Sequence, residues 1–572
     1  MRVYFLCFLV FSLLLLSSFL IKTDIFPNND LGANVVPLAY FKDTVGLFQI
    51  PLWNPYIQQG IPAVSDPLYG IYNPVISLPV LLLHPTQAIK MTYFLSVLLA
   101  CMSMFMLLRF FKIYTVFTVI ISLTYASCSY LPGRIHAGHL EKVVSYGLIP
   151  LFFLCYFKTI QEKNIMWAGL TALTVVLILF SGDLYGALYA LFCLTWGCIF
   201  FIWKDKRVLM NLIVIVLLFI LFASIKLLPM IELQGYILKT KEPFQGSQNP
   251  ISILYYLFFP FSLLLSPIFP IRNFLSQSYG WWESICFIGP GSFMGILYIC
   301  RKLKKPSDTI YIILAVTFIL LVLLSMPAFP LNPIHILIKY VDFIGFFHVP
   351  SRIFIFMAVI VLIGFGLFLN SLKNKRLAVV IAVLNLIMVV GYSQYIFISK
   401  DFEALDERYK PLIRKAASAN QEYFLKNKRL GEIPYLYAYE NKTFPIRSNY
   451  GLHLKNSLNT DRVMPLGELN GQAQPIFIGV NTFSTTLDSS KSGTFTVYQS
   501  SYPGFAGYID GKRSELQSSK FLQLKTIPGK HTYEFRFNSY VFLVGAAIST
   551  SSICLWTLYV IKKKYFHFPK VS

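Results

Sequence analysis

The chain has 572 residues, of which 56% are hydrophobic and 13% are charged, and its formal net charge is +23. Soluble domains carry about twice this share of charged residues, so the composition and a mean hydropathy of +0.61 argue against a soluble enzyme. The positive charge does not require a nucleic-acid partner, because membrane proteins retain Lys and Arg in their cytoplasmic loops and next to anionic lipid.

Apolar runs long enough to cross a bilayer recur along the sequence, which predicts a polytopic α-helical membrane protein with about twelve transmembrane helices. The predicted spans lie near residues 3–21, 86–108, 113–130, 143–160, 165–181, 184–203, 208–228, 284–300, 308–326, 352–370, 377–397 and 538–561. The first is interpreted as a retained anchor, because no Ala-x-Ala cleavage site follows it.

Clusters of Lys and Arg test this arrangement of spans. They lie at residues 109–112, 158–163, 204–207, 301–305, 373–376 and 562–564. With twelve spans they all fall on one side, as the positive-inside rule requires, so both termini are predicted to be cytoplasmic. Residues 250–270 are also apolar, but a crossing there would move the cluster at 301–305 outside. We therefore expect a re-entrant or interfacial pair of short helices, and we expect 75–83 to be too short to cross.

The first outer loop, residues 22–85, is the longest polar interval in the first part of the chain. Leu38, Phe41, Val45 and Phe48 recur at helical spacing and predict an amphipathic helix on the membrane surface, where it would cover a lipid-facing cavity. The prolines that follow exclude a regular helix, and the aromatic residues among them favour an ordered loop.

Residues 399–537 are polar and contain runs of alternating hydrophobicity, including a hairpin with an Asp510-Gly511 turn. They predict an extracytoplasmic β-sandwich. The domains predicted from the sequence are therefore a transmembrane domain at 1–398, this β-domain at 399–537, and a final helix with a basic cytoplasmic tail at 538–572.

Five different short motifs follow one another along most of the chain. They are Asn29-Asp30 with Pro37; Pro51-Leu52-Trp53-Asn54-Pro55 with Gly60-Ile61-Pro62 and Asp66-Pro67; Arg134 with His136-Ala137-Gly138-His139-Leu140; Phe347-His348-Val349-Pro350-Ser351-Arg352; and Tyr502-Pro503-Gly504 with Ile509-Asp510-Gly511-Lys512 and Pro528-Gly529-Lys530-His531. This series resembles the YfhO-like family of bacterial membrane proteins, within the GT-C class of glycosyltransferases. Asn29 and His348 depart from the family pattern, which has glycine and arginine there.

The resemblance implies a GT-C-like fold and an inverting glycosyltransferase in the bacterial cytoplasmic (inner) membrane. Such an enzyme takes a sugar from a polyprenyl-phosphate carrier and passes it to a cell-envelope glycan, glycolipid or polymer on the outer face. The implied partners are the lipid-linked donor, the envelope acceptor and the bilayer, with no nucleic acid.

Inverting transfer needs a carboxylate for the acceptor hydroxyl and a cationic group for the departing phosphate. Asp30, just past the first span, is the predicted catalytic carboxylate, and its alternative role is a helix N-cap. The cationic group is either a divalent metal such as Mg or Mn, for which no ligand set is evident, or arginine.

Other residues are predicted to contact the substrate. Arg134 and Arg352 suit a phosphate, although Arg352 could instead extend to the interface. His136 and His139 share a short outer loop with Arg134, and a two-histidine pattern is weak evidence for metal binding. Alternatives also remain for three residues of the first loop. Asp66, which precedes a proline, suits either the start of a turn or a sugar or metal contact. Trp53 and Asn54 suit either a sugar site or an interfacial anchor and a turn. The sequence leaves Asp183 and Glu283 open as metal ligands.

Two other functions remain open. One is a flippase or transporter of lipid-linked glycans, which should show repeated halves and charges at mid-membrane. The other is a non-catalytic envelope assembly factor that keeps the scaffold without the chemistry.

Overall fold

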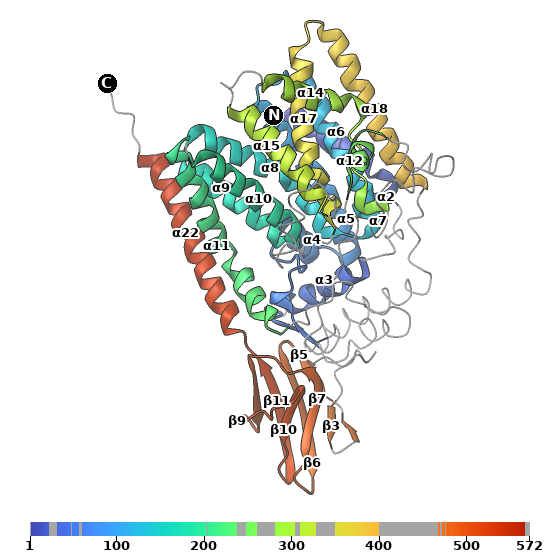
Figure 1. Cartoon of the computed structure of the whole chain (residues 1–572). Helices are drawn as coiled ribbons and strands as arrows, with labels where there is room; N and C mark the ends of the chain where they lie inside the picture. The colour runs from blue at the N-terminus through green and yellow to red at the C-terminus, as the bar shows by residue number, and fades with distance from the viewer. Residues whose placement is uncertain are drawn as a thin grey trace.

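The structure of the protein is a computed structural model. It describes residues 2–21, 31–46, 48–55, 60–202, 204–236, 248–259, 281–303, 309–327, 349–399, 467–469, 472–474 and 476–566. Helices occupy one end of the molecule in Figure 1, and the strands form a separate domain at the other end. The helix α22 (Tyr540–Phe566) follows the last strand and returns to the far end of the helical part.

The helical part is that of a membrane protein. Among the described residues, eight helices are long and apolar enough to cross a bilayer. They are α5 (Pro85–Phe110), α6 (Thr115–Ala126) continued by α7 (Tyr130–Ala137), α8 (Leu140–Glu162), α10 (Leu184–Phe201), α11 (Lys206–Gln234), η6 (Pro350–Ile353) continued by α17 (Phe354–Ser371), α18 (Lys375–Ser399), and α22.

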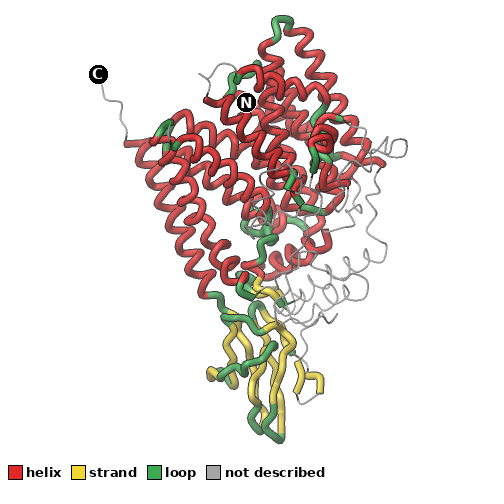
Figure 2. Tube along the Cα trace, in the orientation of Figure 1, coloured by secondary structure: helices red, strands yellow, loops and turns green. Residues whose placement is uncertain are grey.

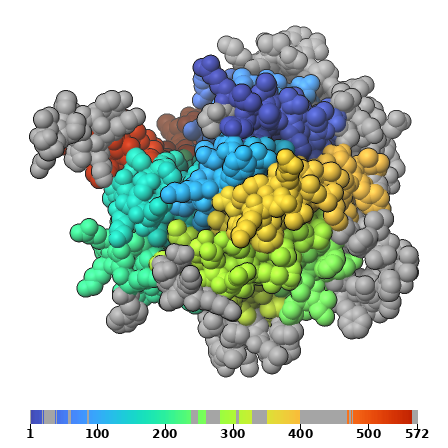
Figure 3. All heavy atoms as spheres, turned by 90° about the horizontal axis from the view of Figure 1, so that it is seen from above, coloured from blue at the N-terminus to red at the C-terminus, as the bar shows by residue number. Residues whose placement is uncertain are grey.

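Shorter apolar helices occupy three more of the predicted spans. These are α1 (Arg2–Leu15), α9 (Ile165–Phe180) and α15 (Thr309–Ser325). The first predicted span is interrupted at Leu16, after which α2 (Ser17–Ile21) begins. Seen along the bundle from the end away from the strands, atoms of α1 lie at one side and α22 lies at the edge (Figure 3).

The predicted span at 284–300 is wrong. The chain forms α13 (Trp281–Ser284), five residues without helix at 285–289, η4 (Pro290–Ser292) and then α14 (Phe293–Lys302). Gly289 has a φ of 92°, and a Cβ there would lie 2.2 Å from Asn385 Oδ1, so glycine is required. Asn385 Nδ2 donates to Ile288 O at 3.0 Å, which satisfies a carbonyl that the break leaves outside a helix.

Two short apolar segments do not cross the bundle. The helix α4 (Pro74–Leu82) confirms that 75–83 is short, and α12 (Pro250–Phe258) provides the first of the short helices expected at 250–270. The rest of that expected pair lies outside the described residues. A helix is confirmed in this part of the first loop as α3 (Leu31–Gly46), which packs against α4 and α5 at the end of the bundle next to the strands (Figure 1). Of the predicted apolar stripe, Leu38 is buried, but Phe48 lies beyond the helix and is fully exposed.

The β-domain is built from two antiparallel sheets, drawn yellow in Figure 2. One has the order β10-β7-β3-β4 and the other β5-β6-β11-β8-β9. Their bounds are β3 (Gly467–Leu469), β4 (Gln472–Gln474), β5 (Phe477–Gly479), β6 (Thr482–Ser489), β7 (Thr494–Ser500), β8 (Phe505–Ile509), β9 (Lys512–Ser514), β10 (Phe521–Lys525) and β11 (Gly529–Phe537).

Alternation along these strands produces the core of the domain. Phe483, Phe495, Leu524, Tyr533 and Phe535 are buried in one cluster, as expected where two sheets pack face to face. The predicted hairpin is confirmed: β8 pairs with β9 through a turn whose two residues both have positive φ. Of the domain predicted at 399–537, residues 400–466 lie outside the described residues.

Candidate functional site

Several membrane helices begin at the end of the bundle next to the β-domain (Figure 1). They include α8, α10 and the η6–α17 helix, and the short helices α7 and α13 lie beside them. Because these helix starts converge, charged side chains from distant parts of the sequence meet at this end.

The centre of this meeting point is Glu283 of α13. Arg134 of α7 donates from Nη1 to Glu283 Oε2 and from Nη2 to the Glu283 backbone O at 2.8 Å. Arg352 of η6 donates from Nε to Oε2 at 3.0 Å and from Nη2 to Oε1 at 2.7 Å. All three residues are buried. One carboxylate thus connects two guanidinium groups, and we call Glu283, Arg134 and Arg352 the ion cluster.

Burial alone would raise the pKa of Glu283, because a buried carboxylate loses hydration. The positive charges of Arg134 and Arg352, with a smaller contribution from His139, instead hold this pKa well below its usual range. His139 Nδ1 lies 3.8 Å from Glu283 Oε1 and 3.4 Å from Arg134 Nη1. Glu283 is therefore an anion at neutral pH.

A second buried pair lies next to the ion cluster. Lys142 in the first turn of α8 donates to Asp183 Oδ1. The ring of Tyr185 connects the two groups, with its centroid 4.7 Å from Lys142 Nζ and 4.9 Å from Arg352 Cζ. Cations over an aromatic face gain electrostatic attraction that grows when water is excluded. Asp183 also caps α10, since its Oδ1 accepts from Gly186 N at 2.9 Å.

Glycine sets the chain direction at both turns that supply this site. Gly138, with a φ of 79°, ends α7 and lets α8 begin at Leu140. Gly182, with a φ of 95°, separates α9 from α10, and a Cβ there would lie 2.3 Å from Leu68 O. The first loop and the α9–α10 turn therefore pack directly on one another.

Lys226 fixes the first loop against the bundle. Its buried Nζ, on α11, donates to Pro67 O at 2.9 Å, Tyr69 O at 2.9 Å and Leu179 O at 3.2 Å. Asp66 accepts from Leu68 N at 2.9 Å. Burial raises the pKa of Asp66, whereas the Leu68 hydrogen bond and the charge of Lys226 act to lower it. Lys226 therefore holds the first loop through these hydrogen bonds, and its positive charge also acts on Asp66 of that loop.

The structure brings together some of the residues that the sequence predicts as substrate contacts. Arg134, His139 and Arg352 lie in or against the ion cluster. The ring of His136 packs against the two tryptophans that precede Glu283, with centroid distances of 5.0 Å to Trp281 and 5.6 Å to Trp282. Asp30 lies outside the described residues.

Trp53 and Asn54 lie in β1 (Trp53–Asn54) and are buried where the first loop meets the β-domain. Trp53 Nε1 donates to Gln499 Oε1 at 2.8 Å, and its ring packs against Tyr502, Phe505 and Phe537. These contacts cover the ring of Trp53 and join the first loop to the β-domain, a role that neither of the alternatives left open by the sequence describes.

Sequence reasoning did not single out Lys142 or Lys226. Both stand in predominantly apolar helices, and a lysine in such a run is itself a signal, because burying its charge without compensation is costly. Among the described residues, no group of three His, Cys, Asp or Glu side chains is placed to hold a metal ion. Glu283 pairs with Arg134 and Arg352 and Asp183 pairs with Lys142, so whether either binds a metal stays open.

Neither a family model nor a curated protein matches the chain, so membership of the YfhO-like family stays a prediction. Among solved structures, the chain is similar to the cryo-EM structure of the arabinofuranosyltransferase AftD from Mycobacteria. The TM-score is 0.46 and the sequence identity 14%, over 69% of this chain and 27% of that one. The chain therefore spans little more than a quarter of the length of that protein.

Proposed function

We propose that the protein is a membrane glycosyltransferase of the GT-C class. It moves a sugar from a polyprenyl-phosphate carrier to a cell-envelope glycan, glycolipid or polymer on the outer face of the bacterial cytoplasmic membrane. The observation that carries the proposal is the ion cluster, in which Glu283 holds Arg134 and Arg352 together at one end of a membrane bundle. Buried charge in a membrane protein is costly and marks functional sites.

The position of the ion cluster supports sugar transfer more than transport. It lies at the helix ends, next to the first loop and on the side of the β-domain, rather than halfway along the spans. A donor with a lipid tail and a phosphate headgroup needs cations at this depth, where the headgroup meets the ends of the helices. Arginine suits the role because its planar fork matches phosphate oxygens.

In the proposed reaction, the acceptor hydroxyl oxygen attacks the anomeric carbon of the sugar. A new carbon–oxygen bond forms as the bond from that carbon to the phosphate oxygen breaks, and the configuration inverts. Asp30 takes the hydroxyl proton, and the polyprenyl phosphate leaves with the electron pair. Arg352 and Arg134 stabilise the negative charge that builds on that phosphate. Glu283 orients both guanidiniums, and Tyr185 covers the one on Arg352.

The remaining residues have supporting roles. Asp66 and Asn54 of the first loop, with His136 and His139 near α13, are proposed contacts for the sugar or the acceptor. Trp53 is not proposed as a sugar contact, because residues of the β-domain cover its ring. A divalent metal such as Mg or Mn is the alternative to the arginines for stabilising the phosphate, and no step is assigned to it.

The test is a transfer assay in nanodiscs with radiolabelled polyprenyl-phosphate sugars and cell-envelope extract. Wild-type protein is expected to move label to the extract. Asp30→Asn and Arg352→Gln are each expected to lower the rate by about 100-fold or more. Asp43→Asn, an aspartate of the same first loop that has no proposed role, is the matched control and should retain activity.

Equal activity of Asp30→Asn and wild type, at equal protein levels, would show that Asp30 is not the catalytic carboxylate. Movement of lipid-linked glycan across vesicles without transfer would contradict the enzyme and favour a flippase.

A further inference from the structure

A second site lies at the opposite end of the helices from the ion cluster. The walls of a recess of about 550 Å³ come from α1, α5, α8 and α9, which pack side by side in that order, and from Thr115 at the start of α6. This volume is typical of small-molecule and lipid headgroup sites. The recess lies near the end of α5 and of α8 and near the start of α1 and of α9, so it opens where these helices leave the bilayer.

The floor of the recess is apolar and its sides are aromatic. Phe105 and Leu154 are buried at 5% and 6% exposure, while Tyr4, Phe110 and Trp167 are half-buried around them. A surface of this kind in contact with the bilayer suits an acyl chain. Tyr and Trp at the ends of membrane helices are typical of the headgroup level.

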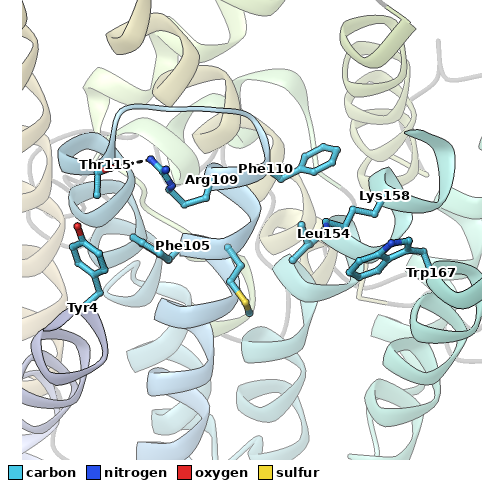
Figure 4. A pocket seen from close by; sticks show the side chains of 9 residues that line it. Tyr4, Phe105, Arg109, Phe110, Thr115, Leu154, Lys158 and Trp167 are labelled. Carbon is cyan, nitrogen blue, oxygen red and sulfur yellow. Dashed lines mark hydrogen bonds between the residues drawn. The ribbon is translucent and has the colours of Figure 1, made fainter. Parts of the chain in front are cut away.

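Two cations stand at the edge of the recess. Figure 4 shows Arg109 reaching toward Thr115 on one side and Lys158 lying beside Trp167 on the other. Arg109 Nη1 donates to Thr115 Oγ1 at 2.8 Å, and Lys158 Nζ lies 4.0 Å from the Trp167 ring centroid. Aromatic contact and a hydroxyl hydrogen bond orient both groups without neutralising them.

The charge around the recess is positive. Lys158 has one carboxylate partner, Glu162, at 3.5 Å, and both side chains are partly exposed, so that pair is weak. In the described part of the chain, no carboxylate lies within ion-pair distance of Arg109.

We propose that this recess binds an anionic phospholipid of the leaflet at this end of the helices. The phosphate faces Arg109 and Lys158, and an acyl chain lies along Phe105 and Leu154. Basic pockets between membrane helices on the cytoplasmic side bind anionic headgroups by this combination of charge and apolar contact. The inference does not depend on the proposed transferase activity, because the recess and the ion cluster lie at opposite ends of the bundle.

The test is native mass spectrometry of the full-length protein in detergent with equimolar phosphatidylglycerol and phosphatidylcholine. We expect wild type to retain phosphatidylglycerol preferentially. The double variant Arg109→Gln, Lys158→Gln is expected to bind it about 30-fold more weakly. The matched control is Lys112→Gln, Lys204→Gln, which removes the same charge from exposed residues outside the recess and should change binding less than about threefold.

Arg109→Lys keeps the charge and should retain binding near the wild-type level. An equal loss of binding in the recess variant and in the control would mean that overall charge attracts the lipid, and would overturn the proposal. So would equal retention of the two lipids by wild type.

Discussion

Asn481 of the β-domain binds the backbone of the first loop from Ile50 to Trp53. Its Oδ1 accepts from Leu52 N at 2.8 Å and from Trp53 N at 2.9 Å, and its Nδ2 donates to Ile50 O at 2.9 Å. A side chain at the β5–β6 turn thus bonds three backbone groups of the first loop, just before and at the start of β1. The β-domain therefore helps to determine the conformation of the first loop, in which the sequence places the catalytic carboxylate.

Asn481→Gly should release this contact without strain, because Asn481 has a φ of 60° that glycine also adopts. The loss of three hydrogen bonds of about 1 kcal/mol each should speed hydrogen exchange at Leu52 and Trp53 by about 30-fold or more. Asn481→Asp keeps the acceptor and serves as the control, with a smaller effect. Unchanged exchange in the glycine variant would show that the aromatic packing of Trp53 alone holds the loop.

Glu283→Gln should destabilise the protein strongly. The change leaves Arg134 and Arg352 buried without a counter-ion, and breaking such a buried pair costs about 3–5 kcal/mol. Thermal unfolding of purified protein in detergent is the measurement. Glu162→Gln, at an exposed pair with Lys158, is the control and should cost less than about 1 kcal/mol. Similar melting temperatures for the two variants would contradict the view that Glu283 is the counter-ion of both arginines.

The exposed pair Asp510–His531 predicts a pH dependence in the β-domain. His531 Nδ1 lies 2.6 Å from Asp510 Oδ2, and Nε2 lies 3.0 Å from Pro528 O. Asp510 Oδ2 and Pro528 O are both hydrogen-bond acceptors, so the protonated His531 ring, which has an N–H donor at each nitrogen, is favoured. The Asp510 hydrogen bond, with the one to Pro528, raises the pKa of His531 above its ordinary 6.5. The Thr532 N–H, with His531, lowers the pKa of Asp510 below its ordinary 3.8.

Stability from the raised His531 pKa is fully present below pH 6.5 and is lost as the pH rises through the folded-state pKa. Stability from Asp510 is present above pH 3.8 and is lost as the pH falls through its folded-state pKa. His531→Gln should therefore lower the melting temperature of the β-domain more at about pH 5.5 than at about pH 9. Equal shifts at the two pH values would show that the pair does not form.

Lys226→Met should loosen the first loop. The variant leaves the carbonyls of Pro67, Tyr69 and Leu179 without their shared donor, at a cost of about 1–3 kcal/mol for each buried group that stays unsatisfied. Limited proteolysis within residues 60–73 is the measurement. Lys206→Met removes an exposed lysine from the start of the same helix and should leave the cleavage rate unchanged. Equal protection of both variants would mean that packing at Gly182 is sufficient to hold the loop.

Hydropathy predicted most of the helices because a membrane span needs only a continuous apolar run. It failed at 284–300 because averaging over a window hides the Gly289-Pro290-Gly291 break, although these residues are turn formers in any sequence. The β-domain was predictable from alternation and from the Asp510-Gly511 turn, since both are local signals.

The candidate site was predictable only in part. Arg134, His139 and Arg352 were selected individually, but nothing local indicates that they share Glu283. Arg134 and Glu283 lie 149 residues apart, and Arg352 lies a further 69 residues along the chain. The packing of the helix starts brings them together, and that packing follows from the whole sequence.

The same separation has a consequence for synthesis of the chain. At about 5–20 residues per second, Arg134 leaves the ribosome about 7–30 s before its counter-ion Glu283. During that interval Arg134 lacks the carboxylate that it pairs with in the folded protein. Assembly of the ion cluster is therefore completed late, and a nascent chain that stops before residue 283 lacks the counter-ion of Arg134.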